Sequence, residues 1–172
     1  VIDNKLGLVD LSRQPQVTAH IGSVGLEQLP AEYLVISPPI NTDDHDQVFA
    51  ALCSHIGYCS RHRLNAGHPY GAMVSTEFLA REQWGCYSHF FTKVVDEPKG
   101  HPCHQKPAGE YAVTYLAGDY YNAAPAFRLL QEYLAQNHLR PGAFCYKEAV
   151  LDEVSMADPS GYLTRISVQV FR

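Results

Sequence analysis

The sequence has little positive charge, no paired cysteine motif and no hydrophobic run that could cross a membrane. Thirteen Lys and Arg stand against eighteen Asp and Glu, for a formal net charge of −5, whereas a nucleic-acid-binding face needs massed basic residues. The five cysteines lack a CxxC spacing, and an odd number without such a pair indicates reduced thiols. We therefore expect a cytoplasmic chain that contacts neither DNA nor a membrane directly.

Several catalytic and DNA-binding signatures are also missing. The sequence has no GxSxG nucleophile elbow, no phosphate-binding glycine loop and no HExxH zinc motif. It offers no helix-turn-helix candidate either. We therefore expect no cofactor, and a binding domain rather than a classical enzyme.

Aromatic residues are abundant instead. Eleven Tyr, seven Phe and one Trp accompany only two Met in 172 residues. A chain of this length can form one substantial hydrophobic core, and that core can also be shared between two similar halves of the chain. The rings must fill that core or line a cavity within it.

The first half of the chain is predicted to form a strand, a helix and a hairpin. Residues 25–37 read as a strand that a proline interrupts. Residues 41–44 supply capping oxygens for a helix that ends before Asn65. Its apolar side chains recur at helical spacing: Val48, Phe49, Leu52, Ile56 and Cys59. Residues 70–76 and 85–95 are expected to pair as two strands.

The same order of elements returns in the second half. Residues 96–107 are rich in proline and form the best linker candidate. Residues 110–116 are expected to be a strand, and a helix that ends near Asn137 follows. Residues 144–152 and 162–171 are the last two expected strands. The repetition, at a spacing of roughly seventy to eighty residues, indicates an internal duplication.

We therefore predict an α+β fold of duplicated βαββ units. Two antiparallel sheets related by a pseudo-twofold axis would carry helices on one face and leave a ligand cleft between the halves. A linker or N-terminal tail is expected at 1–22, and the domain at 23–172. Within the domain, the halves span 23–97 and 108–172, and residues 98–107 link them.

The penultimate expected strand carries a carboxylate among aromatic and branched residues. Strand alternation places Tyr146, Glu148 and Val150 on one face. A carboxylate in apolar surroundings is costly unless a positive or hydrogen-bonding group meets it. Glu148 is therefore either a binding residue that needs a partner or an edge residue paired with Lys147 or Arg165.

Tyrosines gather in the same half of the sequence. Tyr111 and Tyr115 share one face of their expected strand, and Tyr120 follows at the turn. Ring faces beside a carboxylate favour a large delocalised cation, although most strand tyrosines are ordinary sheet and core residues. With two weaker candidates from the first half, the expected ligand-binding residues are Glu148, Tyr111, Tyr115, Tyr120, Tyr146, Phe91 and Trp84.

Several sequence runs resemble the effector-binding domains of the gyrase-inhibitor-like family. They are Lys-Pro-Ala-Gly-Glu-Tyr at 106–111, Gly-Asp-Tyr at 118–120, residues 142–148 with Leu151 and Asp152, and Tyr-Leu-Thr-Arg-Ile at 162–166. Over residues 25–97 the resemblance depends on the order of elements. In that family a glutamate of the penultimate strand contacts cationic effectors, and the resemblance maps it onto Glu148. The family often has Tyr two positions later, where this sequence has Val150.

The resemblance implies the sensor half of a multidrug-responsive transcription regulator of the MerR or AraC class, or a free-standing relative of such a sensor. Its ligands would be aromatic, cationic, drug-like molecules. DNA would be contacted only through a separate DNA-binding domain, to which residues 1–20 would form the end of a linker. A homodimer is compatible with such a full-length regulator.

An enzymatic alternative follows from the same resemblance. Some family members resemble hydrolases of strained, electrophilic small molecules that use a pocket glutamate. Glu148 would then be the base that activates water.

A metal site is the second alternative. His55, Cys59 and His62 recur at i, i+4 and i+7 on the first expected helix, and His101, Cys103 and His104 could add ligands. The spacing matches no closed zinc pattern, and helix faces with Cys and His are commonly the edge of a core.

Overall fold

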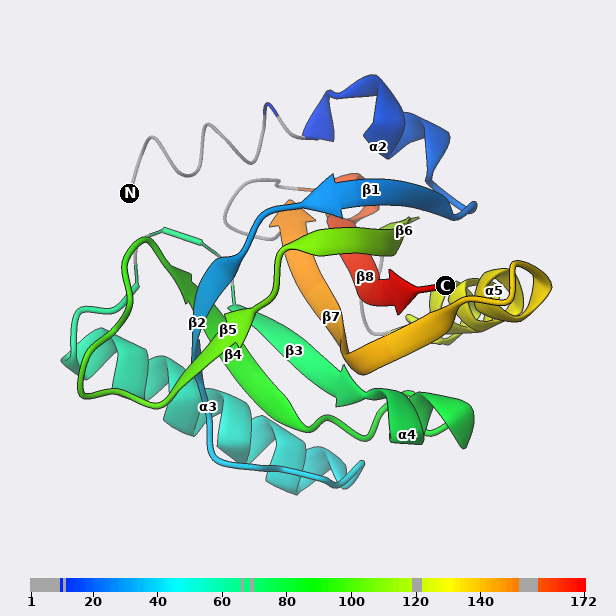
Figure 1. The fold of residues 1–172 in the computed structure, drawn as a ribbon. Coiled ribbons are helices and arrows are strands. Elements are labelled where there is room, and N and C mark those ends of the chain that lie inside the picture. The colour runs from blue at the N-terminus through cyan, green and yellow to red at the C-terminus, as the bar shows by residue number, and fades with distance from the viewer. Residues whose placement is uncertain (1–9, 11, 66, 69, 119–121, 152–157) are drawn as a thin grey trace.

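A curled antiparallel sheet forms the centre of the structure, a computed structural model that describes residues 10, 12–65, 67–68, 70–118, 122–151 and 158–172. The strands of that sheet are β1 (Gly25–Leu29), β2 (Glu32–Ile36), β3 (Tyr70–Ser75), β4 (His89–Val94), β5 (Cys103–Lys106), β6 (Gly109–Ala117), β7 (Arg140–Leu151) and β8 (Leu163–Phe171). The helices are α2 (Pro15–Ala19), α3 (His45–Arg61), α4 (Thr76–Ala80) and α5 (Ala124–Gln136), with a 3-10 turn η1 (Pro159–Gly161). The α+β prediction is confirmed (Figure 1).

The order of strands in the sheet reflects the internal duplication of the sequence. The strands lie in the order β1-β6-β8-β7-β3-β4-β2-β5, so that β6-β8-β7 on one side mirrors β2-β4-β3 on the other. Each half is therefore a strand, a helix and two further strands, as the sequence predicts. The halves do not form two separate sheets, however, because β3 pairs with β7 in antiparallel register and joins them into one.

The outermost strands depart from the expected division of the chain. Residues 25–37 split at Pro30 and Ala31 into β1 and β2, because proline lacks the N–H that a continuous ladder requires. β1 then pairs with β6 of the second half. Residues 98–107, expected to be a linker, contain β5, which pairs with β2.

The structure also contains two short helices, α2 and α4, that the sequence analysis does not predict. α4 follows β3 directly, with the Ser75 side chain accepting a hydrogen bond from the Glu77 backbone N–H at 3.2 Å. α2 lies within the segment expected to be a tail. Its Val17 side chain is buried against the sheet, so this part of the segment packs onto the domain.

The long helix α3 starts where the sequence predicts. The Asp44 side chain accepts a hydrogen bond from the Gln47 backbone N–H at 2.9 Å and caps the helix. His55 and Cys59 are the buried side chains of α3, and both contact Thr92 of β4. This helix therefore covers the sheet in the first half, as α5 does in the second half (Figure 1).

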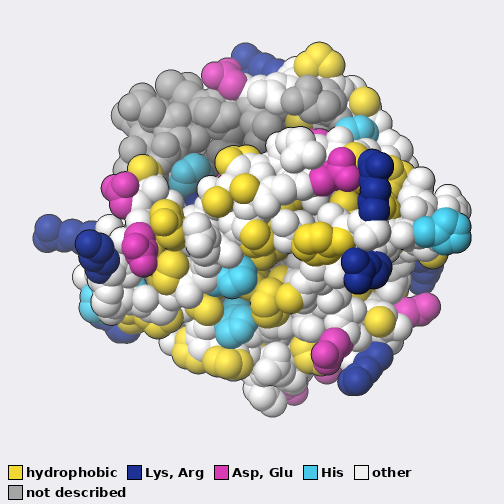
Figure 2. All heavy atoms as spheres, viewed as in Figure 1, with side chains coloured by type: hydrophobic (Ala, Val, Ile, Leu, Met, Phe, Trp, Pro, Cys, Tyr) yellow, Lys and Arg dark blue, Asp and Glu magenta, His cyan; other side chains and the backbone are white. Residues whose placement is uncertain are grey.

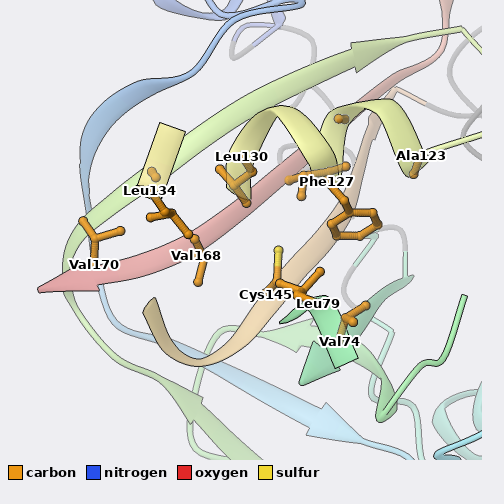
Figure 3. Close-up of a cluster of buried hydrophobic side chains, with 12 residues drawn as sticks. Val74, Leu79, Ala123, Phe127, Leu130, Leu134, Cys145, Val168 and Val170 are labelled. Carbon is orange, nitrogen blue, oxygen red and sulfur yellow. The ribbon is translucent and has the colours of Figure 1, made fainter. Parts of the chain in front are cut away.

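The core on the face covered by α5, here called the helix-side core, is mainly aliphatic. Phe127, Leu130 and Leu134 of α5 point towards Cys145, Val168 and the residues around them (Figure 3). Trp84 stacks on Phe127 at the edge of this core, with ring centroids 5.9 Å apart. The members of the helix-side core are Val74, Leu79, Ala112, Ala123, Ala126, Phe127, Leu130, Leu134, Cys145, Ile166, Val168 and Val170.

The opposite face of the sheet carries a second core, here called the ring-side core, which is rich in aromatic residues. Alternation along each strand separates the two cores, so that Ala112 faces the helices whereas Tyr111 faces the other way. The members of the ring-side core are Val17, Leu34, Met73, Phe91, Tyr111, Val113, Tyr115, Tyr146, Val150 and Leu163.

The surface gives two further observations. None of the helices in the described residues combines the length and apolar character that a membrane span requires. On the face shown in Figure 2, Lys and Arg side chains are scattered and do not gather into one patch.

Gly71 provides a test of this packing. A Cβ at Gly71 would overlap the Phe91 ring and lie 2.7 Å from the Lys147 carbonyl oxygen. We expect Gly71→Ala to lower the free energy of unfolding by about 1–3 kcal/mol, because overpacking a tight sheet forces side chains and backbone to shift. Chemical denaturation measures the change.

Gly57→Ala in α3 is the matched control. Nothing lies within 4 Å of a Cβ at Gly57, so alanine there should raise stability by up to about 1 kcal/mol through helix propensity. Equal effects of the two substitutions would contradict the described packing around Gly71.

Candidate functional site

Glu148 lies near the middle of the sheet, on β7, and is 5% exposed. The Arg165 guanidinium on β8 donates hydrogen bonds from Nη2 and Nε to Glu148 Oε2, at 2.8 and 3.0 Å. The Lys93 ammonium on β4 lies 2.7 Å from Glu148 Oε1. The Lys106 ammonium on β5 lies 3.3 Å from Oε2. Three cations from three strands thus meet one buried carboxylate.

A second carboxylate, Glu32 on β2, completes this arrangement. Lys93 donates a hydrogen bond to Glu32 Oε1 at 2.7 Å, and Lys106 lies 3.1 Å from Glu32 Oε2. The five side chains, here called the charge cluster, therefore come from five strands of both halves. Three positive and two negative groups leave a formal charge of +1.

The charge cluster keeps its carboxylates ionised despite their burial. Burial alone would raise the pKa of Glu148, but the attraction of Arg165, Lys106 and Lys93 outweighs it and holds that pKa well below its ordinary value. Burial acts on Lys106 in the opposite sense and lowers its pKa, an effect that the neighbouring Glu148 partly offsets.

Aromatic rings adjoin the charge cluster on the same face of the sheet. The Lys106 ammonium lies 5.3 Å from the Tyr111 ring centroid and 4.9 Å from that of Tyr146, within the range of a cation–π contact. The Tyr111 and Tyr146 centroids are 6.4 Å apart. Phe91 presents its ring to Tyr146 at a centroid distance of 6.3 Å and an interplanar angle of 77°. We call Phe91, Tyr111 and Tyr146 the ring group.

Hydrogen bonds hold the two tyrosines in place. The Tyr111 hydroxyl donates to the carbonyl oxygen of Pro107, at 2.6 Å. The Tyr146 hydroxyl lies 2.8 Å from His104 Nε2. Both partners belong to the segment that surrounds the end of β5, so the rings and this edge strand are mechanically connected.

The structure brings most, but not all, of the expected ligand-binding residues together. Glu148, Phe91, Tyr111 and Tyr146 meet as described, and Tyr115 belongs to the same ring-side core, opposite Arg165 in the β6–β8 register. Trp84 does not join them, because it packs against Phe127 in the helix-side core. Tyr120 lies outside the residues that the structure describes.

The expected metal ligands do not converge. The His55 Nε2 lies 3.0 Å from Thr92 Oγ1, and burial lowers the pKa of His55 to about 4, so the imidazole is a neutral core residue. His62 instead packs against the rings of Tyr58 and His101. No group of three His, Cys, Asp or Glu in the described part of the chain is placed to hold a metal ion.

Sequence reasoning named Arg165 as a partner of Glu148 but missed Glu32, Lys93 and Lys106. A usable signal exists for two of them. Lys93 stands two residues after Phe91 in an expected strand, and Glu32 stands two residues before Leu34. Residues two apart in a strand share a face, so each charged side chain lies on the same inward face as an apolar residue. Lys106 carried no such signal, because its strand was expected to be a linker.

The charge cluster predicts a specific effect of Glu148→Gln. Removing the carboxylate leaves buried cations without their partner, which should lower the free energy of unfolding at pH 7 by about 3–5 kcal/mol. In the wild type, the low pKa of Glu148 stabilises the fold above the ordinary pKa of 4.5, and this contribution is lost as the pH falls below 4.5. Denaturation curves at several pH values measure both effects.

The exposed residue Glu132 provides the control for that experiment. Glu132→Gln should leave the stability and its acid dependence unchanged, whereas Glu148→Gln should flatten the dependence below pH 4.5. A Glu148→Gln protein as stable as the wild type would contradict the ion pairing.

Comparison with known proteins finds a relative by sequence over most of this chain. The multidrug-efflux transporter 2 regulator of Bacillus subtilis (strain 168) is 28% identical over 162 residues, which are 94% of this chain and 58% of that protein. The chain therefore spans less than two thirds of the length of this relative. No family model matches the chain.

Several solved structures share the fold. The EcmrR C-terminal domain has a TM-score of 0.63 at 11% identity, over 87% of this chain and 98% of that domain. A hydrolase from Listeria innocua has a TM-score of 0.58 at 11% identity, over 93% and 97% of the two chains. A protein solved with tetraphenylphosphonium bound has a TM-score of 0.52 at 12% identity, over 87% and 94%. These likenesses confirm the resemblance seen in the sequence: the chain has the gyrase-inhibitor-like effector-binding fold.

Proposed function

We propose that this chain is the ligand-sensing domain of a multidrug-responsive transcription regulator, and that it binds small aromatic cations on the ring-bearing face of the sheet. The position of the Lys106 ammonium supports this function most strongly. It lies over Tyr111 and Tyr146 and beside Glu148. The chain therefore already places a positive charge between ring faces and a buried carboxylate.

The physical chemistry of that position favours a lipophilic cation. The faces of aromatic rings carry partial negative charge and attract cations, most strongly where water is excluded. A large cation with delocalised charge loses little hydration on entry, whereas a small metal ion would lose much more. Glu148 would supply the counter-charge, and Phe91, Tyr111 and Tyr146 would form walls, with Tyr115 further along the same face.

The comparisons support the same class of function. The Bacillus subtilis relative is named as a regulator of a multidrug-efflux transporter, and one protein of this fold was solved with tetraphenylphosphonium, an aromatic cation. We take tetraphenylphosphonium as the probe of choice for this chain.

The proposed regulator would contact DNA through a separate domain in the cytoplasm. The net charge of −5 is unlike that of a nucleic-acid-binding domain, and the face shown in Figure 2 has no gathered patch of Lys and Arg side chains. Ligand binding would transmit a signal only if the ligand prefers one of two arrangements of the full-length protein, which a homodimer would provide.

The geometry favours a receptor over a hydrolase, although one protein of this fold is described as a hydrolase. A general base works best when its pKa lies near the operating pH. Arg165, Lys106 and Lys93 overcome the effect of burial and hold the pKa of Glu148 well below its ordinary value. Such a carboxylate is a weak base and a persistent negative charge, which suits a counter-charge.

A thermal-shift titration with tetraphenylphosphonium tests the proposal. The cation should raise the Tm of the wild type in a saturable manner, because a ligand at a hundred times its Kd stabilises the folded state by about 2.7 kcal/mol. In Glu148→Gln the cluster has a formal charge of +2, so the cation-induced shift, measured from that variant's own Tm, should be much smaller.

Trp84→Phe is the matched control for that titration. Trp84 packs on the helix side of the sheet, so this variant should respond to the cation as the wild type does. Equal cation-induced shifts in the wild type and Glu148→Gln would show that Glu148 is not the counter-charge. A chain that no cation stabilises would contradict the proposed ligand class.

A further inference from the structure

Lys106 differs from the other cations of the charge cluster because it lies on an edge strand of the sheet. It is the last residue of β5, a four-residue strand at the edge of the sheet that pairs with β2. Its side chain is 0% exposed, although the first and third residues of the same strand are exposed. A long, flexible side chain thus reaches from a short edge strand into the buried interior on the ring-side face of the sheet.

The contacts of Lys106 are those that a cationic ligand would need. Its ammonium lies 3.3 Å from Glu148 Oε2, 3.1 Å from Glu32 Oε2 and over the two tyrosine rings of the ring group. Among the described residues, Lys106 is the member of the charge cluster that lies over these rings. Lys93 and Arg165 bind the carboxylates from β4 and β8 instead.

The charge balance of the cluster leads to the same conclusion. With Lys106 in place, three cations face two carboxylates, and a further cation would meet a net positive charge. Without the Lys106 charge, Lys93 and Arg165 would balance Glu32 and Glu148, and an incoming cation would restore the present charge. A cationic ligand would therefore meet less repulsion at this position with the Lys106 ammonium displaced than with it in place.

We propose that Lys106 is a tethered cation that competes with cationic ligands and thereby sets the affinity and charge selectivity of the site. This inference rests on the proposed cation-binding function and adds a residue that determines its specificity. A bound ligand cation displaces the Lys106 ammonium from Glu148 and the rings. Neutral aromatic molecules gain nothing from that exchange, because the rings and carboxylates keep their preference for a positive charge.

Two features make the exchange feasible. The Lys106 ammonium is held in place against a desolvation cost, since burial lowers the pKa of Lys106 despite the nearby carboxylates. The strand that carries Lys106 is short and pairs with β2 at the edge of the sheet, so a displacement of this strand breaks few hydrogen bonds. The Tyr111 hydroxyl also binds the Pro107 carbonyl next to Lys106, which links the ring to this movement.

The experiment compares the affinity of the whole chain for tetraphenylphosphonium in the wild type, Lys106→Met and Lys106→Arg, by isothermal titration calorimetry. Methionine keeps an unbranched side chain without the charge. We expect Lys106→Met to bind the cation about tenfold more tightly than the wild type, which corresponds to about 1.4 kcal/mol. Lys106→Arg keeps the competing charge and should show no such gain.

Two controls separate charge competition from other effects. Lys99→Met removes an exposed positive charge elsewhere and should leave the affinity unchanged. Triphenylphosphine oxide, a neutral aromatic molecule, should show no comparable gain in Lys106→Met, whereas equal gains for both ligands would mean that methionine merely opened space. Lys106→Gln, which can still donate hydrogen bonds to the carboxylates, replaces Lys106→Met if that variant does not fold.

The possible results distinguish this inference from the proposed function. If the wild type binds the cation and Lys106→Met binds it no better, competition by Lys106 is wrong and the proposed function stands. If neither the wild type nor the Lys106 variants bind the cation, the proposed ligand class fails and the inference fails with it.

Discussion

The structure depends on one electrostatic constraint: Glu148 is buried and must be neutralised from within the protein. Removing a carboxylate from water is costly unless cations and hydrogen-bond donors replace the lost hydration. Here Lys93, Lys106 and Arg165 do so from three different strands. Each strand must therefore keep its register, because a slip of one residue would turn its charged side chain to the opposite face. The charge cluster thus connects the assembly of the sheet to the chemistry of the site.

The duplicated architecture is what makes this cluster possible. β3 and β7 join the two halves, and the register places Gly71 opposite Glu148. The missing side chain at Gly71 leaves room for the Phe91 ring, so an aromatic wall can lie beside the charges. α4 and α5 pack on the other face through a mainly aliphatic core, whereas α2 packs into the ring-side core. Both faces of the sheet therefore bury apolar side chains, and the ring-side face also combines rings with charges.

Sequence patterns predicted the local elements well and the long-range pairing poorly. The cap at Asp44, the alternation around Glu148 and the repeated order of strands and helices are local signals, and the structure agrees with each of them. The pairing of β1 with β6, the existence of β5 and the meeting of Lys106 with Glu148 depend on residues far apart in the chain. No periodicity within a short window reports such contacts. Trp84 illustrates the same limit, because its aromatic character suggested a wall of the site whereas tertiary packing places it beside Phe127.

We expect one position, between Tyr111, Tyr146 and Glu148, to accommodate either the Lys106 ammonium or a ligand cation. A crystal structure of the chain with tetraphenylphosphonium bound would show which cation occupies this position. In that structure we expect the cation to lie against the two tyrosine rings and the Lys106 ammonium to lie beyond ion-pair distance of Glu148. A cation bound elsewhere, with Lys106 still 3.3 Å from Glu148, would contradict this expectation.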